Sequence, residues 1–275
     1  MSEHVYKENI LEKLSSEPKY FWKRFSIFLI ILGLVIWGSY GSKYGITDKG
    51  INVAKAIING ITHPETLLLF NWTIKGIPYL LLETISIAFL GTLIGSLLAI
   101  PFAFLSSTNI VPRWVSLIFR SITMLIRTIP SLVWALIWIR VTGPGAFCGV
   151  VTQSICSIGM VSKMYITAIE NLDTGVLEAL DAAGCNTFEK IRVGIIPQLS
   201  ASFISTAIYR FDINLKDATI LGIVGAGGIG FPLTDAIANA RWNRVGAFVI
   251  CLVGLVIIIE YISTKIRARL ARGRS

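Results

Sequence analysis

Charged side chains interrupt two long apolar stretches of this chain, and their types could do chemistry there. Arg210, Asp212, Lys216 and Asp217 lie in the apolar stretch 195–221, and Arg127 lies in another, at 114–141. A charge far from water is costly, so such residues usually mark the path of an ion or substrate, or pair with one another. The residues alone leave both interpretations open.

Helical spacing relates the four charges of the stretch 195–221 to one another. Asp212 and Lys216 are four residues apart, so they share one face of a helix and can form an ion pair. Arg210 and Asp217 are seven apart and can share that face. Asp212 and Asp217 are therefore candidates for structural pairing, and spacing favours this role at least as strongly as contact with a ligand.

A glycine-rich segment follows the same stretch. Its sequence, Gly225-Ala-Gly-Gly-Ile-Gly230, fits the G-x-G-x-x-G pattern of dinucleotide-binding proteins. That pattern needs a preceding β-strand and an acidic residue about 20 positions further on, whereas an apolar helix is expected here and residues 236–259 contain no acid. The segment instead predicts a turn where backbones approach closely. The candidates for a tight re-entrant turn or an outer gate are Gly225, Gly227 and Gly228.

Composition predicts the elements that position these residues. The chain has 275 residues, of which 54% are hydrophobic and 15% charged, against about 25% charged in soluble domains. Mean hydropathy is +0.70, and a helix of about 20 apolar residues spans the hydrocarbon layer of a membrane. We therefore expect an all-α polytopic membrane protein with about six transmembrane helices, at 25–40, 76–104, 114–141, 146–169, 195–221 and 243–264.

The distribution of basic residues predicts the orientation of these spans. A net charge of +9 would suggest nucleic-acid binding in a soluble protein, but the positive-inside rule explains it here. Lys19, Lys23 and Arg24 precede the first span, and a basic segment, 265–274, follows the last. We expect both termini in the cytoplasm, lipid around the spans, and no nucleic-acid partner.

No catalytic centre is predicted. His4 and His63 lie outside the expected spans, and the four cysteines include no Cys-x-x-Cys pair. A metal site, structural zinc or a disulfide is therefore not expected. The chain also lacks the phosphate-binding sequence G-x-x-x-x-G-K-[ST]. We expect a protein without a cofactor and without catalysis of its own.

A polar loop at about 170–197, between the fourth and fifth expected spans, predicts a helix-turn-helix. Asp173 or Thr174 can cap its first helix, and Glu178 lies near the positive end of that helix. Gly184 is placed to end the helix, and Pro197 to open the next span. Small residues lie between them: Ala179, Ala182 and Ala183. A small-residue helix flanked by charge suits docking into a groove on another protein.

This loop resembles the EAA loop of permease subunits of ATP-binding-cassette (ABC) importers. The family pattern is Glu-Ala-Ala, three residues, Gly, nine residues, then Ile-x-Leu-Pro. Four residues match at the right spacing: Glu178, Ala179, Gly184 and Pro197. Three positions depart from the pattern: Leu180, Gly194 and Ile196. The resemblance implies that the loop, with Ala182 and Ala183, carries the coupling to an ATPase.

Further segments are similar to the phosphonate-transporter permease family, which includes phosphite and hypophosphite importers. They are RTIPS (127–131), SIGMVSK (157–163), AIENLDTGVLEAL (168–180) and YRFDINLKDATILGIVGAGGIG (209–230). The resemblance implies a type I ABC importer permease fold in the bacterial inner membrane. Its permease domain would be 76–268, after a head, first span and external segment (1–75) and before a basic tail (269–275).

The same resemblance implies partners and a cargo. The partners would be two ATPase subunits, a second permease copy in a homodimer, and an external substrate-binding protein. The cargo would be phosphonate or a related phosphorus oxyanion, and the candidates for lining its path are Arg127, Arg210 and Lys216. Two alternatives stay open: an ABC permease for another small ligand, such as methionine or a compatible solute, and an ion-coupled secondary transporter.

Overall fold

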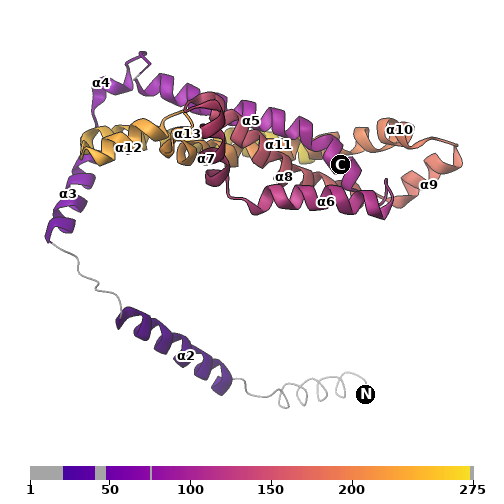
Figure 1. The fold of residues 1–275 in the computed structure, drawn as a ribbon, viewed down its shortest axis with the longest axis horizontal. Coiled ribbons are helices and arrows are strands. Elements are labelled where there is room, and N and C mark those ends of the chain that lie inside the picture. Colours follow the sequence, from indigo (N-terminus) through magenta and orange to yellow (C-terminus); the bar gives the residue numbers. More distant parts are fainter. Residues whose placement is uncertain (1–20, 41–47, 75, 273–275) are drawn as a thin grey trace, which may run out of the picture. The chain divides into compact units, whose positions relative to one another are not determined.

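The computed structural model describes residues 21–40, 48–74 and 76–272, and every regular element in these ranges is a helix (Figure 1). The expected all-α polytopic fold is confirmed. The expected cytoplasmic head, 1–24, lies largely outside the described residues, as do parts of the external segment and the end of the basic tail. The chain divides into two compact units, residues 1–54 and 55–275.

Helix α2 (Phe21–Tyr40) belongs to the first unit, and α3 (Asp48–Thr62) runs across the boundary between the units. The second unit continues with α4 (Thr66–Leu69), α5 (Ile77–Ser106), α6 (Arg113–Thr128), α7 (Ser131–Thr142), α8 (Ala146–Glu170), α9 (Thr174–Ala182), α10 (Thr187–Glu189), the π-helical turn η1 (Lys190–Ile195), α11 (Ile196–Ile223), α12 (Gly230–Ala238) and α13 (Trp242–Arg272). In the described part of the chain, α2, α5, α8, α11 and α13 are long and apolar enough to cross a membrane, and α6 with α7 makes up to six.

The third expected span is not one straight helix. Its two parts, α6 and α7, meet at 88°. Pro130 lies at the break, where it removes a backbone hydrogen bond that a continuous helix would need. The indole of Trp134 donates to the carbonyl of Ile126 (3.3 Å) across the break and so satisfies one of the freed groups. The expected span 114–141 is therefore broken at nearly a right angle.

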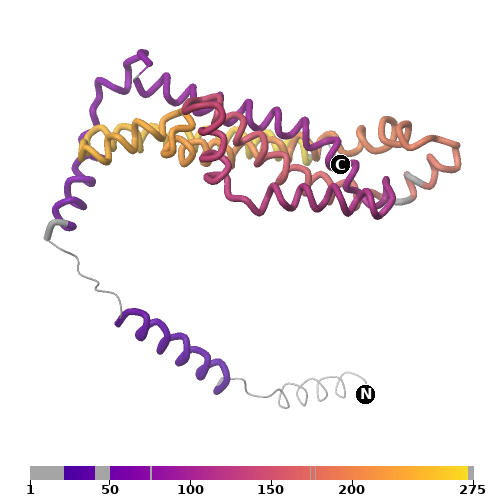
Figure 2. The backbone as a smooth tube through the Cα atoms, in the orientation of Figure 1, coloured from indigo at the N-terminus to yellow at the C-terminus, as the bar shows by residue number. Residues whose placement is uncertain are grey.

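The second unit is a bundle in which α5, α8 and α11 pack against one another and α13 lies along α11 (Figure 2). Small residues set the closeness of α5 and α8. A Cβ added at Gly91 would lie 2.5 Å from Cβ of Gln153, and one added at Gly95 would lie 2.5 Å from Cβ of Ser157. Close backbone approach through small residues is a usual device for packing membrane helices.

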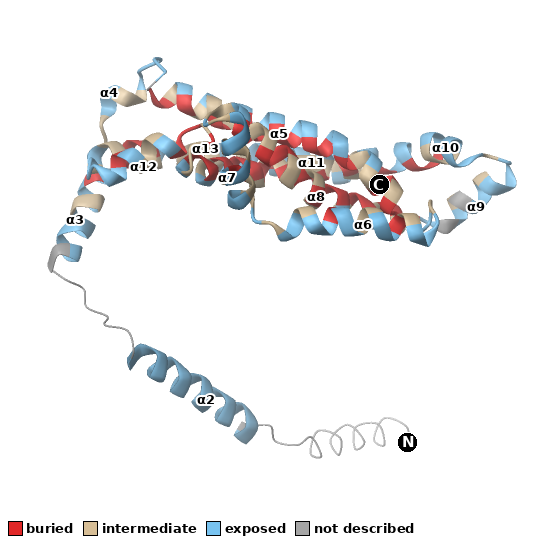
Figure 3. Cartoon of the chain, viewed as in Figure 1, coloured by how far each residue is buried: buried red, intermediate tan, exposed pale blue. Residues whose placement is uncertain are grey.

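Three apolar clusters fill the bundle, and two of them lie toward its ends. Toward α9, the rings of Tyr165 and Phe203 stack with centroids 4.1 Å apart. Toward α12, buried Ile77, Ile229 and Phe248 form the second cluster. The buried residues line the inward faces of the helices, while outward faces carry many exposed apolar side chains (Figure 3). Such an apolar exterior suits a lipid environment.

The end of the bundle near α12 holds the end of α3. A Cβ added at Gly60 would lie 2.3 Å from the carbonyl oxygen of Trp242, so α3 crosses the start of α13 at close range. The Glu65 carboxylate accepts two hydrogen bonds from Arg244, at 3.0 and 3.2 Å. The C-terminal end of α3 is therefore fastened to the start of α13.

Candidate functional site

The loop 170–197, called the docking loop below, begins with a capped helix. The Asp173 carboxylate accepts from the backbone N–H of Gly175 (3.0 Å) at the start of α9. The helix ends at Ala182, and Gly184 just beyond it has a φ of +77°, in the left-handed region that glycine adopts without strain. The N–H of Cys185 then donates to the carbonyl of Leu180 (3.0 Å). The expected cap and stop are both present.

The second half of the docking loop is more irregular than expected. Asn186 and Glu189 form a reciprocal capping box, with hydrogen bonds of 2.7 and 2.9 Å. Only α10 and η1 follow, and α11 begins directly after η1 with Pro197 in its first turn. Two contacts tie the halves together. Lys190 forms an ion pair with Asp181. Leu180 packs directly against Gly194, because a Cβ added at Gly194 would lie only 2.4 Å from Cδ1 of Leu180.

The predicted coupling residues of α9 and its C-terminal end face outward. They are Glu178, Ala179, Ala182 and Ala183, all exposed, as is Gly184. Phe188 on α10, in the same loop, is 70% exposed. A short helix with small exposed side chains can enter a groove on another protein without steric conflict. The docking loop projects beyond the ends of the neighbouring helices (Figure 1).

The expected Asp212–Lys216 pair is wrong. Asp212 instead accepts from Arg267 (3.4 Å), and Lys216 pairs with Glu260 (3.2 Å). Both partners lie on α13, which runs antiparallel to α11. The Arg267 guanidinium also lies over the ring of Tyr209, 5.5 Å from its centroid. The pairs therefore link two helices rather than two turns of one helix.

Arg210 is the most deeply buried of the candidate path residues. It is 6% exposed, and its guanidinium lies 4.0 Å from the Asp217 carboxylate. Its Nε donates to the Ser157 hydroxyl (3.1 Å), and its Nη1 approaches Sδ of Met160 (3.1 Å). The seven-residue spacing of Arg210 and Asp217 is thus realised as a long ion pair, and the guanidinium also reaches α8.

Arg127 approaches the same turn of α8 from another helix. A Cβ added at Gly159 would lie 2.7 Å from Cγ of Arg127, so this side chain lies directly against Gly159. Arg127 is exposed, at the break between α6 and α7. Arg127 and Arg210 therefore both contact the segment Ser157–Met160, whereas Lys216 is exposed and lies against α13.

A buried polar network accompanies Arg210, and the sequence reasoning missed it. The Asn214 amide donates to the hydroxyls of Thr92 and Ser157, both at 2.8 Å. Gln153 donates to the carbonyl of Asn214 (2.8 Å). Gln153 and Asn214 are essentially inaccessible, and their amide oxygens have no protein partner. The signal was present, since a Gln and an Asn within apolar spans are as unusual as charges there.

The glycine segment is a packed turn rather than a loose loop. Gly225, Gly227 and Gly228 have φ of +93°, +83° and +72°. The carbonyl of Gly225 accepts from the N–H of Gly145 (2.9 Å), and Thr84 accepts from the N–H of Ile229 (3.0 Å). This turn, residues 224–229, joins α11 to α12, so neither the strand nor the βαβ unit of a dinucleotide site is present.

Known proteins resemble the chain across this region. The sequence model of the family described as "Binding-protein-dependent transport system inner membrane component" matches residues 91–272. The phosphate-import permease protein PhnE of Mycolicibacterium smegmatis is 35% identical over 68% of the chain and 36% of its own length. The phosphite transport system permease protein PtxC of Stutzerimonas stutzeri is 31% identical over 68% of each. The chain thus spans little more than a third of the Mycolicibacterium protein.

Two solved structures share the fold. A chain of the MetNI methionine ABC transporter, in an inward-facing conformation, has a TM-score of 0.62 and 19% identity over 70% of this chain and 95% of its own. A chain of an amino acid ABC transporter with histidines has a TM-score of 0.57 and 20% identity over 80% and 96%. The expected type I ABC importer permease fold is confirmed. With its helices, its docking loop and its match over most of its length, the chain belongs to the family of binding-protein-dependent transport system inner membrane components.

Proposed function

We propose that the chain is the membrane-spanning subunit of an ABC importer for phosphate, phosphite or phosphonate oxyanions. The observation that carries the proposal is the docking loop: a capped helix, an open small-residue face, a left-handed Gly184 and Pro197, in a chain of the permease family. Relatives named for phosphate and phosphite transport support the cargo. The subunit has no catalysis of its own.

The proposed assembly follows from the exposed features. Two ATPase subunits bind the docking loops of two permease copies, which we take to be identical. A substrate-binding protein delivers the anion at the opposite end, near α12 and the end of α3. Both termini then lie in the cytoplasm of a bacterial cell, with the docking loop on the same side of the inner membrane. Lipid covers the exposed apolar faces.

The proposed anion path passes the turn of α8 that Arg127 and Arg210 contact. Arg210 has only a 4.0 Å ion pair with Asp217, so its charge is incompletely compensated. The exposed Arg127 guanidinium lies where the break of α6 and α7 frees backbone groups. Positive charge there attracts an oxyanion, and an exposed arginine releases it again more easily than a buried one. The glycine turn closes the α12 end as a gate, and Lys216 contributes charge beside Glu260.

Arg127→Ala tests the path. Loss of one charge-assisted hydrogen bond is worth about 1.5–3 kcal/mol, so ATP-driven phosphite uptake into proteoliposomes should fall about tenfold or more. Arg140→Ala removes an exposed arginine from α7 and should leave uptake near the wild-type rate. Equal uptake by both variants contradicts the path, provided both assemble with the ATPase.

The same proteoliposomes separate the alternatives. Uptake that follows an imposed ion gradient without ATP would identify a secondary transporter instead. Uptake of methionine or glycine betaine, with none of phosphite, phosphate or phosphonate, would keep the ABC permease and replace its cargo. The methionine alternative rests on the shared fold, and the betaine alternative on a glycine betaine/carnitine permease of Listeria monocytogenes that is 23% identical over 64% of the chain.

A further inference from the structure

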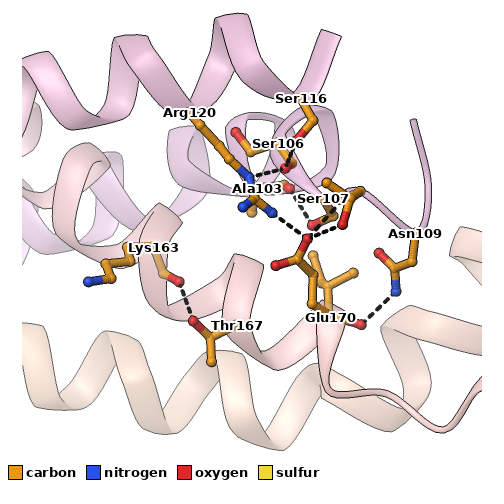
Figure 4. Close-up of polar contacts among 11 residues, drawn as sticks. Ala103, Ser106, Ser107, Asn109, Ser116, Arg120, Lys163, Thr167 and Glu170 are labelled. Atoms are coloured by element: carbon orange, nitrogen blue, oxygen red, sulfur yellow. Dashed lines mark hydrogen bonds and ion pairs between the residues drawn. The ribbon is translucent and has the colours of Figure 1, made fainter. Parts of the chain in front are cut away.

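A polar cluster lies where the docking loop leaves α8. The last residue of α8, Glu170, points its carboxylate at the loop 107–112 between α5 and α6 (Figure 4). Its Oε1 accepts from the N–H of Thr108 (2.9 Å), from the Thr108 hydroxyl (2.6 Å) and from the Arg120 guanidinium. One carboxylate oxygen therefore joins three elements: α8, the loop 107–112 and α6.

Further bonds fix the same junction to the backbone. Arg120 Nε donates to the carbonyl of Ser106 (2.8 Å), and the Ser116 hydroxyl donates to that same carbonyl. The Asn109 amide donates to the carbonyl of Ile169 (2.9 Å). These two carbonyls lie at the C-terminal ends of α5 and α8, where carbonyl groups have no partner inside their own helix. They accept these hydrogen bonds instead and so hold the junction together.

The position of the cluster in the chain gives it a mechanical consequence. Three residues, 171–173, separate Glu170 from α9. Leu172 and Val176 already pack the base of the docking loop against the apolar cluster of α5 and α8. The polar cluster adds directional bonds from the end of α8 to the loop 107–112 and to α6, and α6 leads to the break beside Arg127.

We propose that Glu170, with Arg120 and Thr108, is a positioning cluster that transmits movement of the docking loop to α5 and α6. The proposal rests on the proposed ABC importer function. Glu170 touches neither cargo nor ATP; it acts by holding α8, the loop 107–112 and α6 as one body. Charge-assisted hydrogen bonds suit this role, since they are directional and about twice as strong as neutral ones.

Glu170→Gln is the test, because it keeps the shape and removes the charge. Thr167→Val is the control: it removes a hydroxyl that donates to the carbonyl of Lys163 (3.0 Å), a hydrogen bond that stays within α8. Both variants are reconstituted with the ATPase and assayed for phosphite transported per ATP hydrolysed. We expect Glu170→Gln to lower that ratio at least threefold while ATP hydrolysis persists, and Thr167→Val to leave it unchanged.

A second measurement needs neither cargo nor ATPase. In the full-length permease in detergent, hydrogen exchange should rise in both 107–112 and 171–183 in Glu170→Gln, and in neither segment in Thr167→Val. Thr108→Val replaces this variant if Glu170→Gln does not fold. It removes the hydroxyl donor and keeps the backbone N–H, so hydrogen exchange should rise in both segments, by a smaller amount. An unchanged transport ratio, or a rise confined to 107–112, overturns the proposal. A wild-type complex without ATP-driven uptake refutes the proposed function instead, and leaves the exchange result to judge the cluster.

Discussion

Gly95→Ala perturbs a close contact between α5 and α8, and its effect can be worked out from the geometry. The added Cβ would lie 2.5 Å from Cβ of Ser157 and 2.6 Å from the carbonyl oxygen of Ser154. Carbon atoms in ordinary contact are about 3.5–4.0 Å apart. Neither neighbour is the flexible end of a side chain, so α5 and α8 must separate by several tenths of an ångström or more.

Two opposing effects set the magnitude. Overpacking of this kind lowers the free energy of unfolding by about 1–3 kcal/mol. Replacing a helical glycine by alanine raises it by up to about 1 kcal/mol, because alanine has the higher helix propensity. Gly254→Ala isolates the second effect, because a Cβ added there meets no atom within 4 Å. The difference in unfolding free energy between the two variants is therefore the overpacking alone, about 1–3 kcal/mol.

Thermal unfolding in detergent measures this difference. At about 2–4 °C per kcal/mol for a chain of this size, Gly95→Ala should unfold roughly 2–12 °C below Gly254→Ala. The separation should also lengthen the Asn214 hydrogen bonds to Thr92 and Ser157, both 2.8 Å. Unfolding temperatures that agree within about 1 °C would refute the close packing of α5 on α8.

Three further changes test other features. Gly184→Ala forces a left-handed conformation at a cost of about 1–2 kcal/mol; it should weaken binding of the ATPase to the permease, measured by titration, and unaltered affinity would argue against a role for the α9 stop. Lys216→Glu and Glu260→Lys should each reduce uptake and their combination should restore it; a double variant no better than the singles would exclude the pair. Asp212→Asn weakens the hydrogen bond from Arg267 and should lower the free energy of unfolding by about 1.5–3 kcal/mol. A denaturation curve measures this loss, and an unchanged curve would contradict the pairing.

The long helices could be predicted because apolar length is a one-dimensional property. The expected spans 76–104 and 146–169 differ from α5 and α8 by at most two residues at either end. The break of the third span was only partly accessible. A proline such as Pro130 predicts an interrupted helix. The 88° angle, however, depends on how α6 and α7 each pack against α8, and no local sequence pattern predicts that packing.

The candidate site divides in the same way. The caps and stop of α9 are local, so Asp173 and Gly184 could be identified from their residue types. The ion pairs of α11 depend on the packing of another helix. Four-residue spacing brings Asp212 and Lys216 to one face, yet each pairs instead with a residue of α13. Asn214 was missed because only charged residues were considered, although an uncharged amide in an apolar span also needs hydrogen-bond partners.

Helix α11 connects the two regions that the proposed transport cycle has to coordinate. Its first residue follows η1 of the docking loop, and its last precedes the glycine turn at 224–229. A helix of 28 residues is about 42 Å long, so a tilt at one end appears at the other unless the helix bends. Arg210 and Asn214, near its middle, bind α8 and α5, and these contacts form the natural pivot. If α11 rocks about these contacts in the proposed cycle, the docking loop and the glycine turn move in opposite directions, as alternating access by rocking requires.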